Sequence, residues 1–197
     1  MSLMTNPSED VPEPDSPASA SFRPDPADAH ALADWVFPEF VIDHQLGAPG
    51  WLAYLNADLA QSAGLLIAGF KAAHPLPAAQ LSVLWTDDQQ MAQLNRDWRG
   101  KDGPTNILSF ENGTSDPQTD RLLLGDLALG RETIEAEAAR AGIPVTAHLA
   151  HLLLHGLLHL CGFDHETENE AAVMETLESQ LMRAAGLADP WAKGGAA

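Results

Sequence analysis

The segment 155–165 constrains this chain more than any other, because it reads His-Gly-Leu-Leu-His-Leu-Cys-Gly-Phe-Asp-His. His155 and His159 are four residues apart, so on a helix their Cβ atoms share one face about 5–6 Å apart. Gly162 can end that helix, since glycine adopts positive φ, and the chain can then turn back. The spacing therefore predicts that the ring of His165 approaches the other two imidazoles.

Three converging imidazoles are typical of a zinc centre with a hydrolytic function. Imidazole nitrogens bind zinc at roughly 2.0–2.1 Å, and three protein ligands leave a fourth position for water, as in catalytic zinc sites. Zinc lowers the pKa of such a water to about 7, which makes it a nucleophile at neutral pH. We therefore expect one Zn²⁺ ion on His155, His159 and His165. The alternative is three ordinary histidines on and beside a half-buried helix.

Two other histidines and the single cysteine lie near these ligands. His151, His155 and His159 span two helical turns, so the outer two rings lie too far apart to share an ion. We assign His148 and His151 to support of the site or to a substrate cleft, with structural roles as the alternative. Cys161 follows His159 by two residues and points elsewhere on a helix, so we interpret it as a buried small residue.

The residue at position 156 distinguishes between the hydrolytic reactions that such a zinc site could catalyse. The spacing matches the zinc-protease pattern H-E-x-x-H-x-x-G-x-x-H, but Gly156 stands where that pattern has its general base. Peptide hydrolysis would then need another acid, for which Asp164 and Asp126 are the candidates. Phosphodiester hydrolysis fits better, because a metal polarises the phosphoryl oxygen and a cation stabilises the developing negative charge.

The segment 95–102 offers such a cation. Three of the ten basic residues fall within six positions there: Arg96, Arg99 and Lys101. Trp98 between them presents a ring on which a nucleic-acid base can stack. The segment could equally be a solvated loop with ion pairs to Asp97 and Asp102, and the sequence leaves both interpretations open.

Composition limits the class of protein. With 28 acidic and 10 basic side chains the formal charge is −18, which repels nucleic acid at long range and disfavours a tight, passive nucleic-acid binder. A metal or a local basic cluster can reverse that field within a cleft. A single cysteine excludes an intrachain disulfide framework. We see no membrane span and no secretory signal, so we expect a cytoplasmic protein.

The hydrophobic pattern predicts a small α/β or α+β sandwich, with a mixed sheet packed against about five helices. We expect a disordered, acidic, Pro-rich tail over 1–29, one metal-dependent hydrolase domain over 30–190 and a flexible C-terminus over 191–197. The predicted strands are Phe40–Leu46, Leu81–Trp85, Thr105–Phe110 and Leu122–Leu129, the last with a bulge or close backbone approach at Gly125-Asp126. The predicted helices are Trp51–Ala73, one around Met91 and Leu94 capped by Asp87 or Asp88, Arg131–Ala141, Pro144 or Val145 to Leu160 or Cys161, and Glu168–Ala185 with Val173, Leu177, Leu181 and Met182 inward.

Two long motifs give the chain a family resemblance. The segment 155–165 resembles H-G-x-L-H-L-x-G-[YF]-D-H, and the segment 94–110 resembles L-N-x-x-[YW]-R-x-K-D-x-P-T-[DN]-V-L-S-F. Both motifs are typical of the YbeY endoribonucleases, also described as bacterial rRNA maturation factors, and Gly125-Asp126 falls where that family has its G-D pair. The resemblance covers roughly residues 40–190.

The resemblance implies a specific activity and fold. It implies a single-strand-specific, zinc-dependent endoribonuclease that acts in 16S rRNA 3′-end maturation and ribosome quality control. Its partners would be single-stranded rRNA and the ribosome or its small subunit, with no membrane and no DNA. It also implies zinc on the three histidines, a catalytic role for Arg99 at the scissile phosphate, and a zincin-like α+β fold with a four-stranded mixed sheet. The alternatives are a zinc hydrolase of another substrate, and a ribosome assembly factor whose metal is structural.

Overall fold

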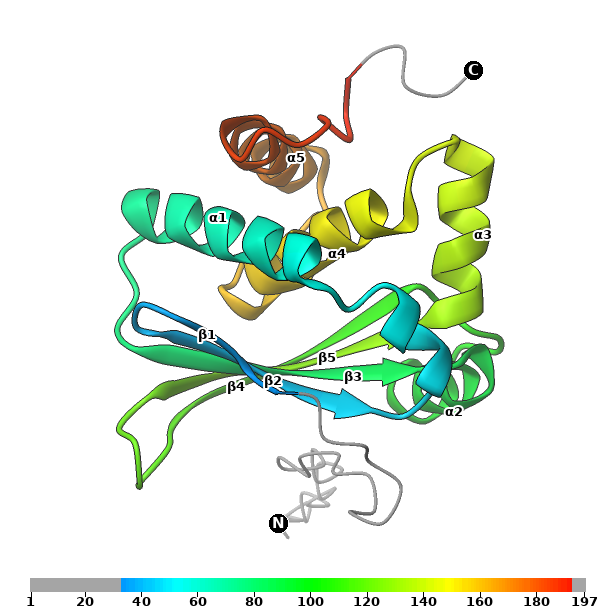
Figure 1. Ribbon diagram of the computed structural model, residues 1–197, viewed down its shortest axis with the longest axis horizontal. Coiled ribbons are helices and arrows are strands. Elements are labelled where there is room, and N and C mark those ends of the chain that lie inside the picture. Colours follow the sequence, from blue (N-terminus) through cyan, green and yellow to red (C-terminus); the bar gives the residue numbers. More distant parts are fainter. Residues whose placement is uncertain (1–32, 193–197) are drawn as a thin grey trace, which may run out of the picture.

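A computed structural model of the protein describes residues 33–192, which form a mixed sheet with helices on both faces (Figure 1). The predicted tail over 1–29 and most of the predicted C-terminal segment 191–197 lie outside the described residues. The elements are β1 (Trp35–Phe37), β2 (Phe40–Leu46), the 3-10 helix η1 (Pro49–Ala53), α1 (Ala57–Ala73), β3 (Ala79–Thr86), α2 (Asp88–Arg99), β4 (Ile107–Ser115), β5 (Leu122–Gly130), α3 (Arg131–Ala141), α4 (Val145–Leu160) and α5 (Glu168–Ala184).

The sheet confirms the predicted α+β class and adds one strand to the four that we expected. Its order is β1-β2-β3-β5-β4. The three inner strands β2, β3 and β5 are parallel to one another, whereas the outer strands β1 and β4 each pair antiparallel with the strand beside them. The unpredicted strand β1 has three residues, which is too short to display an alternating pattern.

Successive side chains along each strand point to opposite faces of the sheet, and different helices pack on the two faces. On β2 the buried residues are Phe40, Ile42, His44 and Leu46, which confirms the predicted period of two. The main hydrophobic core lies between the sheet and the helices α1, α3, α4 and α5, which cover one face of the sheet (Figure 1). On the other face a smaller cluster joins α2 to the sheet through Leu84, Met91, Leu94, Leu108 and Ala128. The edge strand β4 therefore has α4 on one side and α2 on the other.

One predicted helix is divided into two, and one predicted strand is longer. The segment expected as a helix over 51–73 consists of η1 and α1, because Asn56 caps α1 by accepting a hydrogen bond from the Leu59 amide (3.1 Å). Strand β4 continues to Ser115, five residues beyond the predicted end. The close approach predicted at Gly125 is confirmed, since a Cβ there would lie 2.0 Å from the Phe110 carbonyl oxygen.

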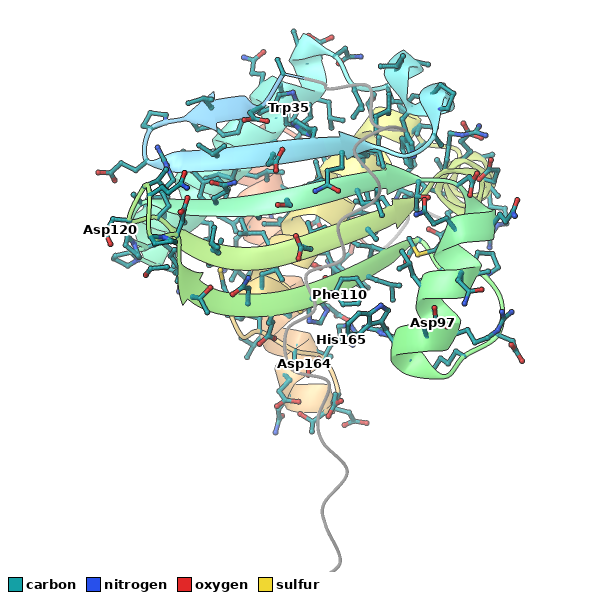
Figure 2. The ribbon with its side chains drawn as sticks, turned by 90° about the horizontal axis from the view of Figure 1, so that it is seen from below. Trp35, Asp97, Phe110, Asp120, Asp164 and His165 are labelled. Carbon is teal, nitrogen blue, oxygen red and sulfur yellow. The ribbon has the colours of Figure 1, made fainter. Side chains whose placement is uncertain are left out.

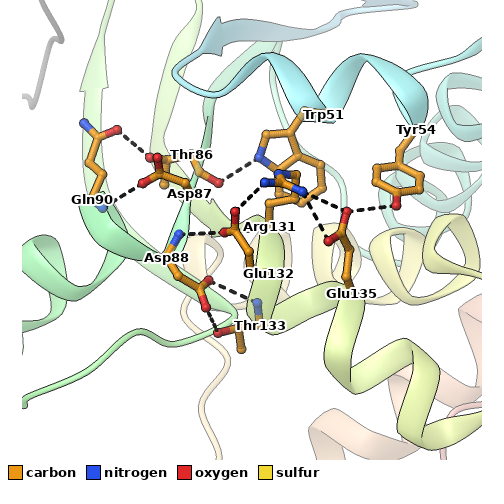
Figure 3. A network of polar contacts seen from close by, with 10 residues as sticks. All are labelled: Trp51, Tyr54, Thr86, Asp87, Asp88, Gln90, Arg131, Glu132, Thr133 and Glu135. Atoms are coloured by element: carbon orange, nitrogen blue, oxygen red, sulfur yellow. Dashed lines mark hydrogen bonds and ion pairs between the residues drawn. The ribbon is translucent and has the colours of Figure 1, made fainter.

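A polar network fixes the helices at the carboxyl ends of β3 and β5 (Figure 3). Asp88, in the first turn of α2, accepts hydrogen bonds from the backbone amide (3.0 Å) and hydroxyl (2.8 Å) of Thr133 on α3. The Asp88 amide in turn donates to Glu132 (2.8 Å), and Arg131 pairs with both Glu132 and Glu135. The starts of α2 and α3 are thereby held together, and α3 leads directly into α4.

Among residues 33–192, no single helix has the length and hydropathy that crossing a bilayer requires. Only α3 and α4 taken together reach them, and this pair is bent by 115° at its junction.

Candidate metal centre

The helix α4 lies against β4 and β5, and Gly156 sets how closely it approaches. A Cβ at position 156 would lie 2.7 Å from Leu127 Cδ2 and 2.9 Å from Ile107 Cδ1. A side chain at position 156 would therefore point into the sheet, where there is no space for a carboxylate. The side chain that would be the general base of a zinc protease cannot occupy this position without moving α4 away from the sheet.

The two histidines on either side of Gly156 are partly buried and face one another. The Nε2 atoms of His155 and His159 are 3.1 Å apart, and the two ring centroids are 4.6 Å apart. The ring of His165 lies 5.4 Å from that of His155 and 5.0 Å from that of His159. One nitrogen from each of the three rings lies within 4.8 Å of the others, so the cluster could hold a metal ion. The predicted convergence of the three imidazoles is confirmed.

The reversal that brings His165 back begins at the predicted residue. Gly162 has φ +84°, and its amide donates to the His159 carbonyl (2.8 Å) while the Phe163 amide donates to Leu158 (3.0 Å). The Phe163 ring then packs against Phe70 on α1. Helix α5 starts soon afterwards with a capping box, so both ends of the short loop that carries His165 are fixed.

Burial and neighbouring charges keep the imidazole of His159 suited to a metal. Burial lowers the pKa of His159, and the nearby His155 and His165 lower it further. Asp164 opposes this effect, with Oδ1 3.9 Å from His159 Nδ1. Metal ligation requires neutral imidazole, so a lowered pKa favours the binding form. A set of three neutral imidazoles fits Zn²⁺.

A buried carboxylate supports the cluster from α5. Glu178 has no exposed surface, and its Oε1 lies 2.8 Å from His155 Nδ1. Its Oε2 accepts a hydrogen bond from the Trp191 indole (2.7 Å) and lies 3.3 Å from His151 Nε2. Burial alone would raise the pKa of Glu178, but the nearby His151 and the hydrogen bonds from His155 and Trp191 outweigh it and lower the pKa to about 2.

Glu178 and Trp191 are functional-site residues that we did not predict from the sequence. Glu178 occupies an inward position of α5, four residues after Met174 and four before Met182, both buried. A charged residue on the apolar stripe of a helix was the available signal, because buried carboxylates require partners. Val173, expected inward, is exposed. Trp191 begins the C-terminal segment that we predicted to be flexible, and it makes the contact to Glu178.

The remaining residues near the cluster have separate roles. His148 Nε2 lies 2.8 Å from Glu137 Oε2 on α3, so this histidine joins two helices away from the three rings. Cys161 is partly buried, and burial, helped by Glu111, raises the pKa of its thiol to about 11, which disfavours a thiolate ligand. Asp126 lines a small cavity with Leu94 and Phe110, on the face of the sheet opposite α4. Of the two candidate acids, only Asp164 lies beside the histidines.

The basic segment lies at the end of α2, across β4 from the histidines. Arg96 pairs with Asp102 (3.2 Å), which confirms part of the solvated-loop interpretation. Arg99 is exposed and makes no hydrogen bond or ion pair with any residue in the described range. Trp98 is exposed over 41% of its surface and packs edge to face on Phe110, with ring centroids 5.3 Å apart.

No hydrogen bond or ion pair among the described residues joins Arg99 to the three histidines. In Figure 2 the labelled Phe110 and His165 both lie at the β4 edge of the sheet, and α2, marked by Asp97, lies on the face toward the viewer. The histidines and the cation thus approach the same sheet edge from opposite faces.

Comparison with known proteins identifies the family of this chain. The family model described as Endoribonuclease YbeY matches residues 57–186. A protein named Endoribonuclease YbeY from Sinorhizobium medicae is 47% identical over 115 residues, which cover 58% of this chain and 68% of that protein. One of the same name from Chelativorans sp. is 43% identical over 157 residues, covering 79% and 95%.

One more relative and one solved structure are also similar to this chain. A protein named Endoribonuclease YbeY from Jannaschia sp. is 42% identical over 159 residues, covering 76% of this chain and 99% of that protein. The solution structure of TM1509 from Thermotoga maritima aligns with a TM-score of 0.46 at 19% identity, covering 77% of this chain and 99% of that one. The family model and the relatives agree with the motif resemblance, and the chain belongs to the endoribonuclease YbeY family.

Proposed function

We propose that this chain is a zinc-dependent endoribonuclease that cleaves single-stranded RNA, and that it acts in the cytoplasm in 16S rRNA 3′-end maturation and ribosome quality control. The observation that carries the proposal is the approach of one nitrogen from each of His155, His159 and His165 to within 4.8 Å. Membership of the family, and the name endoribonuclease of its members, supports RNA as the substrate. The small ribosomal subunit is the corresponding partner.

His155, His159 and His165 would hold the ion. When bound, zinc supplies a Lewis acid that polarises a phosphoryl oxygen. The chain itself presents three imidazoles, excludes water on the sheet side through Gly156 and its contacts, and offers Asp164 as a proton acceptor beside His159. The same close packing at Gly156 leaves no position on α4 for the glutamate of the zinc-protease pattern, so a peptidase would depend on Asp164 as its proton acceptor.

Arg99 supplies the positive charge for the phosphate. Its guanidinium is exposed and without an ion-pair partner among residues 33–192, so it can pair with two non-bridging phosphate oxygens. The exposed face of Trp98 next to it can stack on an unpaired base of single-stranded RNA. The bases of duplex RNA are already stacked and are not available for this contact. With a charge of −18 on the whole chain, such local contacts have to overcome long-range repulsion, which favours a small footprint on RNA.

The test combines metal analysis with an end-labelled RNA cleavage assay. We expect zinc in the purified chain, and cleavage of a single-stranded RNA but not of the same sequence in a duplex or as DNA. His159→Ala should lose both zinc and cleavage. Arg99→Ala should keep zinc and lose about 10²–10³-fold in rate, as expected for loss of a charge-stabilising donor.

Arg140→Ala, which removes an exposed arginine on α3, is the matched control and should cleave like the wild type. A zinc-loaded wild type without ribonuclease activity would refute the enzymatic proposal. If His159→Ala in addition failed to fold, an assembly factor with a structural metal would be the better description.

A further inference from the structure

Glu178 is the residue through which the C-terminal end of the described chain reaches the histidine cluster. Two ring N–H groups donate to its two oxygens, His155 to Oε1 and Trp191 to Oε2, and His151 Nε2 lies 3.3 Å from Oε2 without a hydrogen bond. An ionised carboxylate only accepts hydrogen bonds, so His155 must carry its proton on Nδ1 to make the 2.8 Å contact. A neutral imidazole protonated on Nδ1 has its lone pair on Nε2.

That lone pair faces the point where the three rings converge. His155 Nε2 is the atom that lies 3.1 Å from His159 Nε2, so the tautomer set by Glu178 is the one able to bind a metal there. Glu178 cannot turn away to serve another partner, because it has no exposed surface and both oxygens are engaged. Among the three histidines of the cluster, His155 is the one that Glu178 contacts by a hydrogen bond.

Trp191 fixes the second oxygen of Glu178 and is itself held by α5. Its backbone amide donates to Asp189 Oδ1 (3.0 Å), which also accepts from the Ser179 hydroxyl (2.8 Å). Asp189, which follows α5, also forms an ion pair with Arg183 on that helix (3.3 Å). The Trp191 ring lies edge on to His151, with centroids 6.1 Å apart. The turn after α5 thus covers the side of Glu178 that faces away from His155.

We propose that Glu178 is a positioning residue that holds His155 in the metal-binding tautomer, and that Trp191 locks Glu178 in place. The proposal deepens the proposed function and rests on it for the role of zinc. It assigns a function to a buried acid on α5 and to a tryptophan beyond that helix, neither of which contacts the ion site directly. Hydrogen-bond partners of metal-binding histidines typically change metal affinity by 10–100-fold when removed.

Glu178→Gln is the informative substitution, because glutamine keeps the shape but has one acceptor. If its oxygen faces His155, its NH₂ group meets the Trp191 indole, which can only donate. If its oxygen faces Trp191, its NH₂ group donates to His155 Nδ1, which moves the His155 proton to Nε2 and blocks the metal position. Trp191→Phe removes the competing donor, so the double variant can return the oxygen to His155.

The assay is zinc affinity of the full chain by competition with a chromophoric chelator, independent of RNA cleavage. We expect Glu178→Gln to bind zinc about 10–100-fold more weakly. Trp191→Phe alone should weaken binding less, since His151 still contacts Oε2, and adding it to Glu178→Gln should restore about tenfold of the lost affinity. Glu175→Gln, one turn earlier on α5, should bind like the wild type. A double variant as weak as Glu178→Gln would overturn the proposal.

The tautomer of His155 provides a readout that needs no variant. Long-range ¹H–¹⁵N correlation spectra of the wild-type chain should show the His155 proton on Nδ1. A proton on Nε2 would overturn the proposal even if Glu178→Gln proved too unstable to purify. A chain with the Nδ1 proton that binds no zinc would instead support the positioning role and refute the proposed zinc-dependent function, so the two failures are distinguishable.

Discussion

Acidification should destabilise this protein through one buried histidine far from the metal centre. His44 on β2 is 5% exposed, and its Nδ1 accepts a hydrogen bond from the Trp85 indole (2.9 Å). The Trp35 ring lies edge on to it, with centroids 4.5 Å apart. Burial lowers the pKa of His44 to about 4, and Asp34 raises it only in part. Protonation would also put two donors, Nδ1–H and the Trp85 N–H, against each other.

The magnitude follows from the difference between the folded and unfolded pKa of His44. The unfolded value is 6.5 and the folded value about 4, so the unfolded state binds more protons between these limits. The contribution of neutral His44 is fully present above pH 6.5 and is lost as the pH falls toward 4. The loss amounts to about 2 kcal/mol between pH 7.5 and 5, and to about 3 kcal/mol once the pH is below both values.

Urea denaturation of wild type and His44→Asn at pH 7.5 and 5.0 measures this loss. Asparagine keeps an acceptor for the Trp85 indole but does not titrate, so its stability should fall by about 2 kcal/mol less over this range. Other titrating groups and any loss of metal affect both proteins alike, so the difference isolates His44. Equal pH dependence in the two proteins would refute the reasoning.

Three further predictions concern the site. Gly156→Ala should cost about 1–3 kcal/mol through overpacking against Leu127, offset by up to about 1 kcal/mol of helix propensity, and should weaken zinc binding as α4 shifts. An unchanged zinc affinity in the chelator assay would contradict it. Gly162→Ala places a Cβ at φ +84° and should cost about 1–2 kcal/mol in urea denaturation, with weaker zinc binding. Direct hydrolysis of the phosphodiester should leave no 2′,3′-cyclic phosphate on RNA products, and mass spectrometry that finds this end group would indicate attack by the 2′-OH instead.

The histidine cluster could be predicted because its geometry is local. Two residues four apart on a helix, a glycine able to adopt positive φ and a third histidine three positions later determine the convergence of His155, His159 and His165 with little help from the rest of the chain. The alternation on β2 and the stop of α3 at Gly142 were readable for the same reason.

The missed features depend on partners distant in sequence. Glu178 is buried because His155, on another helix, and Trp191, beyond α5, supply donors to it, and no periodic pattern contains that information. Asp126 adjoins a motif glycine, but the alternation of side chains on β5 directs it to the face opposite α4. The short strand β1 forms only because β2 offers it a free edge.

Zinc K-edge X-ray absorption of the purified chain tests whether His155, His159 and His165 hold one zinc ion. We expect nitrogen or oxygen scatterers at about 2.0–2.1 Å with imidazole outer shells, and loss of bound zinc in His159→Ala. A sulfur scatterer at about 2.3 Å, which would implicate Cys161, or a chain that binds no zinc at neutral pH, would contradict it.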